Sequence, residues 1–285
     1  MVSPESKAAK VSSFTERFFR TVGHHFVTLS CVQRPPGEAE EKPLVFSGFL
    51  VEAGGVWFYV TAGHILRDIR ASLAAGGKFD IWRLDDQTAG NRFKGAAIPY
   101  AFDIDKWLVI ENEEVGLDYA AVPLDTMYCL QLQAGGAIPI DKVAWGDHVT
   151  EHDQLALVGI PSETIAYDQE TIITGRIAVM PLEESEEPAV AGRRAENQFY
   201  ARLKDLGNVK DIDGMSGGPV FALKKVDGEW KYMVIGVQSG WYPTARTIAA
   251  CPFASLGVAL EEGVGAVKAS TKASAHAGQN DRSGT

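Results

Sequence analysis

Apolar residues along most of this chain come in short runs of the kind typical of β-strands. From His25 onward, runs rich in valine, isoleucine and aromatic residues recur, and turn-forming glycine and proline separate several of them. The first series of runs is FVTLSCV, LVFSGFLVE, VWFYVTA, KFDIWRL and LDYAAVPL. The second series is QLALVGIP, TIITGRIAVM, NQFYARL, GPVFALK, YMVIGVQSG and ASLGVALE. The pattern predicts an all-β protein built from two antiparallel units of similar size.

The two ends of the chain and the joint between the series depart from this pattern. Helix-like spacing links four apolar residues near the start, namely Val11, Phe14, Phe18 and Phe19. The stretch LQAGGAIPIDK at 132–142 interrupts the β pattern with glycine and proline, and from about Ser270 the residues are small and polar without apolar periodicity. The predicted organisation is a helical N-terminal extension at 1–24, β units at 25–135 and 136–265, and a disordered tail at 266–285.

Composition and charge narrow the class of protein. The 285 residues are 46% hydrophobic and 22% charged, which is ordinary globular usage. A net charge of −10 without a basic cluster argues against nucleic acid as a partner. No apolar segment resembles a signal peptide or a membrane span, so we expect no membrane association. The cysteines, Cys31, Cys129 and Cys251, match no disulfide or zinc spacing, which favours a reducing compartment and a cytoplasmic location.

A serine flanked by glycines is the first candidate for chemistry. Ser216 lies in DGMSGGPVF at 213–221. A serine hydroxyl is a weak nucleophile that needs a neighbouring base and donors for the developing oxyanion. Glycines allow a sharp turn in which the amides of Gly214 and Ser216 converge on one point. Taken alone, this stretch is weak evidence, because most serines flanked by glycines are ordinary turn residues.

Two further motifs supply partners for this serine. FYVTAGHIL at 58–66 ends a β-rich run with small residues and then presents His64, and GLDYAAVPL at 116–124 places Asp118 at the start of an apolar strand. Taken alone, His64 is equally a packing residue, and Asp118 is equally a strand-end cap. A carboxylate in apolar surroundings needs a hydrogen-bond partner, and an imidazole is a natural one. Together the three residues predict a nucleophile, a base and a carboxylate that orients the base.

The three motifs resemble those of the chymotrypsin/trypsin-like serine peptidases, of the bacterial type. TAGHIL, LDYAAV and GMSGGPVF resemble the family's histidine, aspartate and serine segments, and their order along the chain is the family's order. FSGFLVE, LVGIP and VIGVQSGW extend the resemblance over about residues 25–262. The resemblance implies two antiparallel six-stranded β-barrels with an active site in the cleft between them, a short N-terminal helix and a disordered C-terminal tail.

The resemblance also implies a function, a serine endopeptidase acting on protein or peptide substrates. Ser216 would attack the peptide carbonyl, His64 would take its proton, Asp118 would hold the imidazole, and the amides of Gly214 and Ser216 would bind the oxyanion. Two alternatives stay open. One is a binding module that keeps the fold but cleaves nothing, and the other is an esterase or acyl hydrolase that uses the same groups.

No metal or organic cofactor is expected. The chemistry implied for the three motifs needs neither, and the histidines of HH at 24–25 and DHVTEH at 147–152 are not accompanied by cysteines or by an HExxH pattern. These histidines are therefore predicted to be structural or surface residues.

One position differs from the family's pattern, and the sequence leaves open which residue forms the base of the specificity pocket. Met215 stands where secreted, zymogen-activated members carry an aspartate, so the site is either constitutively competent or controlled by a regulatory protein partner. By resemblance, the base of the specificity pocket lies at Lys210 or Asp211. Its wall is formed by Ser239, Gly240 and Trp241. Trp241 either narrows this pocket or packs as an ordinary aromatic residue.

Overall fold

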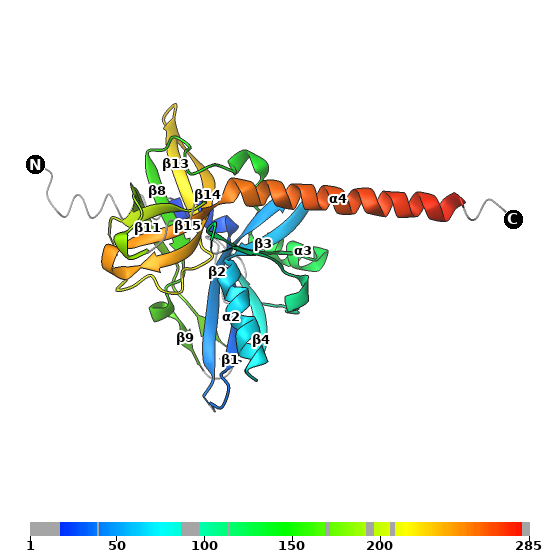
Figure 1. Cartoon of the computed structure of the whole chain (residues 1–285), viewed down its shortest axis with the longest axis horizontal. Helices are drawn as coiled ribbons and strands as arrows, with labels where there is room; N and C mark the ends of the chain where they lie inside the picture. The colour runs from blue at the N-terminus through cyan, green and yellow to red at the C-terminus, as the bar shows by residue number, and fades with distance from the viewer. Residues whose placement is uncertain are drawn as a thin grey trace, which may run out of the picture.

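Two β units form the body of the molecule, and a long C-terminal helix extends away from it (Figure 1). The computed structural model describes residues 18–38, 40–86, 97–112, 114–168, 172–191, 197–205 and 209–280. The side chains of 85, 86, 190 and 272–280 lie outside this description. The predicted all-β class is confirmed, because a closed barrel and a second large antiparallel sheet account for the body.

The first unit is a seven-stranded antiparallel sheet with the order β5-β4-β1-β2-β3-β7-β6. Its strands are β1 (Phe26–Arg34), β2 (Lys42–Ala53), β3 (Val56–Thr61), β4 (Lys78–Asp86), β5 (Ile98–Pro99), β6 (Leu108–Asn112) and β7 (Leu117–Pro123). This differs from the predicted closed barrel of six strands. The two-residue strand β5 adds an edge beside β4, and the order has two ends among the described residues. Pro99 fits an edge strand because it has no N–H to donate to a further strand.

The second unit is the predicted closed barrel of six strands, in the order β11-β12-β15-β14-β13-β8. Its strands are β8 (Gln154–Gly159), β11 (Ala178–Ser185), β12 (Phe199–Leu203), β13 (Pro219–Val226), β14 (Glu229–Tyr242) and β15 (Thr247–Pro252). A small hairpin of β9 (Ala166–Tyr167) and β10 (Ile173–Thr174) lies outside it. Closing the sheet leaves the barrel without an unpaired edge.

Helices lie mostly at the ends and joints of the β units. Residues 18–22 are helical, which confirms the predicted short helix; Val11 and Phe14 of that prediction lie outside the described residues. The α-helices are α2 (Gly63–Ala74), α3 (Thr126–Gly135) and α4 (Phe253–Asn280). Short 3-10 helices are η1 (Gly23–His25), η2 (Ile104–Lys106), η3 (Lys142–Ala144), η4 (Ser162–Thr164), η5 (Ala189–Ala191) and η6 (Pro243–Ala245).

The predicted disordered tail is wrong for residues 266–280, which are helical, and residues 281–285 of that prediction lie outside the described residues. Phe253, Leu256 and Leu260 bury the start of α4 in the core, which nucleates the helix. Farther along, the Nζ of Lys268 donates to the carbonyl of Gly54 at 2.7 Å. The alanine-rich sequence then continues a helix that has already begun, because alanine has the highest helix propensity. No helix in the described part of the chain is long and apolar enough to cross a membrane.

The two β units share one core and several polar contacts. Phe49 and Val60 of the first sheet pack in the same buried cluster as Phe221 and Phe253 of the second unit. The hydroxyl of Tyr119 donates to the carbonyl of Pro252 at 2.6 Å across the same boundary. Packed side chains and hydrogen bonds therefore both hold the two units together.

Candidate active site

His64 lies at the beginning of α2, one residue inside the helix. The N-cap residue Ala62 has no side chain that accepts a hydrogen bond, so the first turn needs an acceptor from elsewhere. Asp118, on the neighbouring strand β7, supplies it, because its Oδ1 accepts the backbone N–H of His64 at 2.7 Å. A carboxylate is stabilised at a helix N-terminus, where unpaired N–H groups concentrate positive charge. One bond thus fixes strand, helix and histidine relative to one another.

The second oxygen of the same carboxylate holds the imidazole. Asp118 Oδ2 lies 2.6 Å from Nδ1 of His64, and an ionised carboxylate accepts only, so Nδ1 carries the proton. The neutral ring therefore has its free lone pair on Nε2. Burial lowers the pKa of His64, but the hydrogen bond to Asp118 and the charges of Asp118 and Asp68 outweigh burial and leave this pKa above its ordinary value.

Ser216 lies in the turn before β13 of the barrel, and two glycines shape that turn. Gly214 and Gly217 have φ angles of 86° and 85°, in the left-handed region that glycine adopts without steric cost. A Cβ at Gly217 would come within 2.0 Å of Thr61 Oγ1, and one at Gly214 within 2.1 Å of Ser162 Oγ. The turn thus needs glycine for its conformation and for its close packing against both units.

The peptide groups that join Asp213 to Gly214 and Met215 to Ser216 have fixed orientations. The carbonyl of Asp213 accepts the N–H of Ser162 at 2.7 Å, and the carbonyl of Met215 accepts the N–H of Gly218 at 3.0 Å. In a trans peptide the N–H points opposite to the carbonyl, so the amides of Gly214 and Ser216 point away from these contacts. Neither amide donates a hydrogen bond within the described part of the chain. Two oriented donors are therefore available beside the Ser216 hydroxyl.

Met215 anchors the turn in the barrel. Its side chain is fully buried in the apolar cluster of the second unit. A Cβ added to Gly159 would lie 2.9 Å from Met215 atoms, so the thioether chain packs directly on the backbone of β8. Apolar packing thus holds the turn at the position that the resemblance pairs with an aspartate of zymogen-activated serine peptidases.

Replacing Met215 with alanine is expected to lower the free energy of unfolding by about 2–5 kcal/mol, because a fully buried side chain leaves a cavity. Replacing it with leucine, which nearly conserves volume, is expected to cost less than about 1.5 kcal/mol. Urea denaturation of the two variants and the unmodified protein measures both values. Equal, small losses in both variants would contradict an anchoring role for this side chain.

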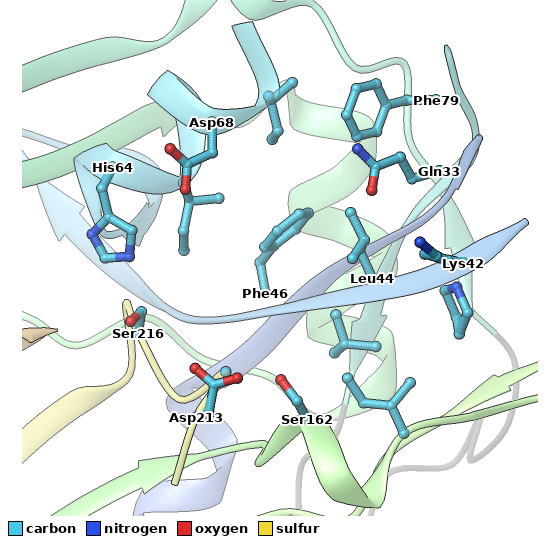
Figure 2. Close-up of a pocket in the computed structure, with 16 residues that line it drawn as sticks. Gln33, Lys42, Leu44, Phe46, His64, Asp68, Phe79, Ser162, Asp213 and Ser216 are labelled. Atoms are coloured by element: carbon cyan, nitrogen blue, oxygen red, sulfur yellow. The ribbon is translucent and has the colours of Figure 1, made fainter. Parts of the chain in front are cut away.

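His64 and Ser216 face each other in a cavity between the two units (Figure 2). This cavity has a volume of about 550 Å³ and also contacts Gly214, and a second cavity of about 800 Å³ contacts His64, Asp118 and Ser239. Among the described residues, Ser216 makes no hydrogen bond to His64. Such bonds are often long in a free enzyme and shorten when substrate is bound.

The residues predicted to form the specificity pocket lie in different places in the structure. Trp241 and Asp211 meet, because the indole Nε1 donates to Asp211 Oδ1 at 2.7 Å, and the same oxygen accepts the N–H of Asp213 at 3.0 Å. Ser239 lines the second cavity, and its hydroxyl accepts from Gln198 at 3.2 Å. Lys210 is exposed, and neither it nor Gly240 lines the two cavities beside Ser216. Trp241 thus donates a hydrogen bond to one of the two residues predicted at the base of the pocket, and it packs against the apolar cluster of the second unit.

The histidines outside the site bond to protein groups. His25 is buried and uses both ring nitrogens, on the carbonyl of Ile138 at 2.8 Å and the hydroxyl of Tyr232 at 2.7 Å. His152 Nδ1 bonds to the carbonyl of Thr150 at 2.9 Å. In the described ranges, no three histidine, cysteine, aspartate or glutamate side chains are grouped to hold a metal ion.

Ser47 is a residue of the site that the sequence did not single out. It is fully buried on β2, its hydroxyl accepts the N–H of Ile160 at 3.0 Å, and it donates to the carbonyl of Gly214 at 3.4 Å. Its own carbonyl accepts the hydroxyl of Thr61 at 2.8 Å. Ser47 thus ties the turn of the second unit to the sheet of the first. A serine inside an apolar strand carries no local motif that would reveal this role.

Comparison with known proteins gives a distant likeness only. No protein-family model matches the chain, and no curated protein sequence matches it. A solved thermostable serine protease from an extremophilic microorganism is 14% identical, with a TM-score of 0.46 over 86% of this chain and 98% of its own. An inactivated protease paralogue of the scabies mite is 14% identical (TM-score 0.44, 86% and 93%), and so is a protease from M. tuberculosis in its active form (0.43, 84% and 81%). At these values the likeness carries no information about activity.

Proposed function

We propose that this protein is a serine endopeptidase whose catalytic residues are Ser216, His64 and Asp118. The observation that carries the proposal is the double hydrogen bond from one carboxylate to the backbone and the ring of His64. It sets the tautomer that a general base needs and aims Nε2 into the cavity that Ser216 lines. Two unpaired amides next to the nucleophile complete the arrangement.

The proposed reaction proceeds through an acyl-enzyme. The Oγ of Ser216 bonds to the substrate carbonyl carbon while its proton moves to Nε2 of His64, and Asp118 stabilises the imidazolium. The carbonyl oxygen becomes an oxyanion that accepts hydrogen bonds from the amides of Gly214 and Ser216. The C–N bond then breaks, and the leaving amine takes the proton from Nε2. Water repeats the sequence on the ester, releasing the acid and restoring Ser216.

The two cavities would receive the parts of the substrate on opposite sides of the scissile bond. The resemblance assigns the strand that contains Ser239 to the specificity pocket, which receives the side chain on the acyl side of the scissile bond. Ser239 lines the larger cavity with Gln198 and Tyr200. The smaller cavity, which contacts Gly214 and Ser216, is then left for residues on the amine side.

The packing of the turn that contains Ser216 favours a site that is catalytically competent without a regulatory protein partner. The packing of Met215 and the two carbonyl contacts that fix the amides all come from this chain alone. Of the two modes of control left open by the sequence, this supports the constitutive one.

A fluorophosphonate probe tests whether the site is an enzyme at all, because it reacts only with an activated serine. Labelling of the unmodified protein is expected at Ser216 and is expected to disappear in Ser216→Ala. Ser255→Ala, at an exposed position on α4, is the matched control and should label normally. An unlabelled native protein would favour the silent binding module. Faster turnover of simple esters than of any member of a peptide library would favour an acyl hydrolase.

A further inference from the structure

The smaller cavity has its own chemical character, separate from the groups that make and break bonds. We call it the amine-side cavity. Its walls are apolar side chains from β2, α2, β4 and the segment after η4: Leu44, Phe46, Ile65, Ile69, Phe79 and Ile165. Ile65 and Ile69 are buried, and Phe46 and Phe79 are partly exposed toward the cavity. A side chain that binds here removes apolar surface from water on several sides.

Two carboxylates stand at the end of this cavity nearest Ser216. Asp68 and Asp213 lie on opposite sides of it, close to His64 and Ser216 respectively (Figure 2). The side chain of Asp213 accepts no hydrogen bond from the described residues. Asp68 has an ion pair with Arg67 at 3.7 Å, but Arg67 also donates to Glu111 at 2.8 Å. The negative charge at this end is thus only partly compensated.

The opposite end of the amine-side cavity is lined by a lysine whose charge is paired. Lys42 lies there beside Gln33 (Figure 2), and the Nζ of Lys42 donates to Glu38 at 2.7 Å. The cavity therefore changes from negative beside the nucleophile, through apolar at Phe46, to a paired lysine at the far end. A bound peptide that leads away from Ser216 would contact these regions in that order.

The backbone beside the cavity is suited to an extended peptide. Strand β2 pairs with β3 only from Phe49 to Ala53, whereas Lys42 to Gly48 pair with β1 alone in the part of the chain that is described. One edge of this segment thus has no strand partner, and the segment lines the amine-side cavity from Lys42 to Phe46. Unpaired strand edges bind extended peptides through main-chain hydrogen bonds.

We propose that the amine-side cavity makes this protein selective for substrates with a basic residue directly after the scissile bond and a bulky apolar residue next to it. The proposal rests on the proposed function. Asp68 and Asp213 would attract the cation, and Phe46 with its apolar neighbours would take the second side chain. The selectivity is thus set on the amine side by residues outside the catalytic group.

Peptides that differ at one position measure each preference as a ratio of kcat/KM. Lysine against its neutral isostere norleucine at the first position is expected to give about a fivefold preference, a value in the range for solvent-exposed charge pairs. Leucine against alanine at the second position is expected to give about tenfold or more. The ratio is used because Asp68 also raises the pKa of His64, an effect that cancels between two peptides.

Substitutions in the cavity test which residues cause the two substrate preferences. The double variant Asp68→Asn/Asp213→Asn is expected to bring the lysine to norleucine ratio to about one. Asp227→Asn/Glu229→Gln, two exposed carboxylates of the β13–β14 hairpin, removes the same charge far from the cavity and should keep the ratio. Phe46→Ala, or Ile165→Ala if the former is unstable, is expected to reduce the leucine preference severalfold. Ratios near one in the unmodified protein, or equal in both double variants, would overturn the proposal.

Failure of this inference and failure of the proposed function give different results. If peptides are cleaved without these preferences, only the inference is wrong. If nothing is cleaved and Ser216 is not labelled, the proposed function is wrong. Calorimetry then still tests the cavity. It measures the binding of two amidated peptide fragments to the Ser216→Ala variant, one that begins with Lys-Leu and one that begins with norleucine-Ala. Tighter binding of Lys-Leu supports its selectivity, and equal binding refutes it.

Discussion

Replacing Ser216 with alanine is expected to lower kcat for a peptide substrate by about 10⁵–10⁶-fold and to leave KM and thermal stability almost unchanged. The loss is large because the covalent route disappears with the hydroxyl, while the backbone amides of positions 214 and 216 remain. The stability is kept because the side chain is only partly buried and has no hydrogen bond among the described residues. Steady-state kinetics and a thermal melt measure the two effects.

The same loss in Ser255→Ala would mean that the assay reports something other than this site. Residual activity in Ser216→Ala above the expected level would show that a contaminating hydrolase or another nucleophile is at work. A fall of more than a few degrees in melting temperature would show that the hydroxyl has a structural role as well.

Replacing Asp118 with asparagine is expected to lower kcat by about 10⁴-fold, because an amide offers its NH₂ group to the ring and favours the wrong tautomer of His64. The change keeps the size of the side chain. It removes the charge and disturbs the two bonds, at 2.7 Å and 2.6 Å, that hold the histidine. Activity measured over a pH series separates the loss of rate from the change in pKa.

The direction of the pH effect follows from the causes of the His64 shift. A general base acts when neutral, so activity rises as pH increases through the pKa of His64, which lies above its ordinary value in the unmodified protein. In Asp118→Asn, burial still lowers this pKa, while the hydrogen bond and charge that raised it are lost. The acid limb of the profile should therefore move to lower pH. Glu229→Gln, an exposed position on β14, should leave the limb in place; an unmoved limb in Asp118→Asn would contradict the assigned role.

Much of the candidate site could be predicted because each of its parts is a local motif. The small residues before His64 and the glycines around Ser216 have conformational consequences that a short window of sequence contains. The structure places His64 at a helix start and Ser216 in a tight turn, and it brings both into one cavity. The barrel of the second unit was predicted for a similar reason, since alternating strands and turn residues mark each hairpin.

Other parts depend on contacts between distant segments, which a window of sequence does not contain. Ser47 takes its importance from Ile160 and Gly214, both more than 100 positions away. The sequence does not reveal the helix α4 for two reasons. Its first part, ASLGVALE at 254–261, is a short apolar run like those predicted as strands, and this prediction is wrong. Its second half has no apolar face of its own and continues a helix nucleated by Phe253 and Leu256. The strand β5 contains only two residues, too few for any alternation to be detected.

The division of the site between two units has a thermodynamic consequence. His64, on α2, and Asp118, on β7, belong to the first unit and Ser216 to the second, so the proposed reacting groups meet only in molecules whose units are docked. Observed turnover is then the intrinsic rate multiplied by the docked fraction, and the shared core and the bonds of Ser47 and Tyr119 across the boundary all favour the docked form. Weakening either bond reduces the number of competent molecules without altering the chemistry of those that remain. In the proposed mechanism, the activity therefore depends on how firmly the two units are docked as well as on the reacting groups.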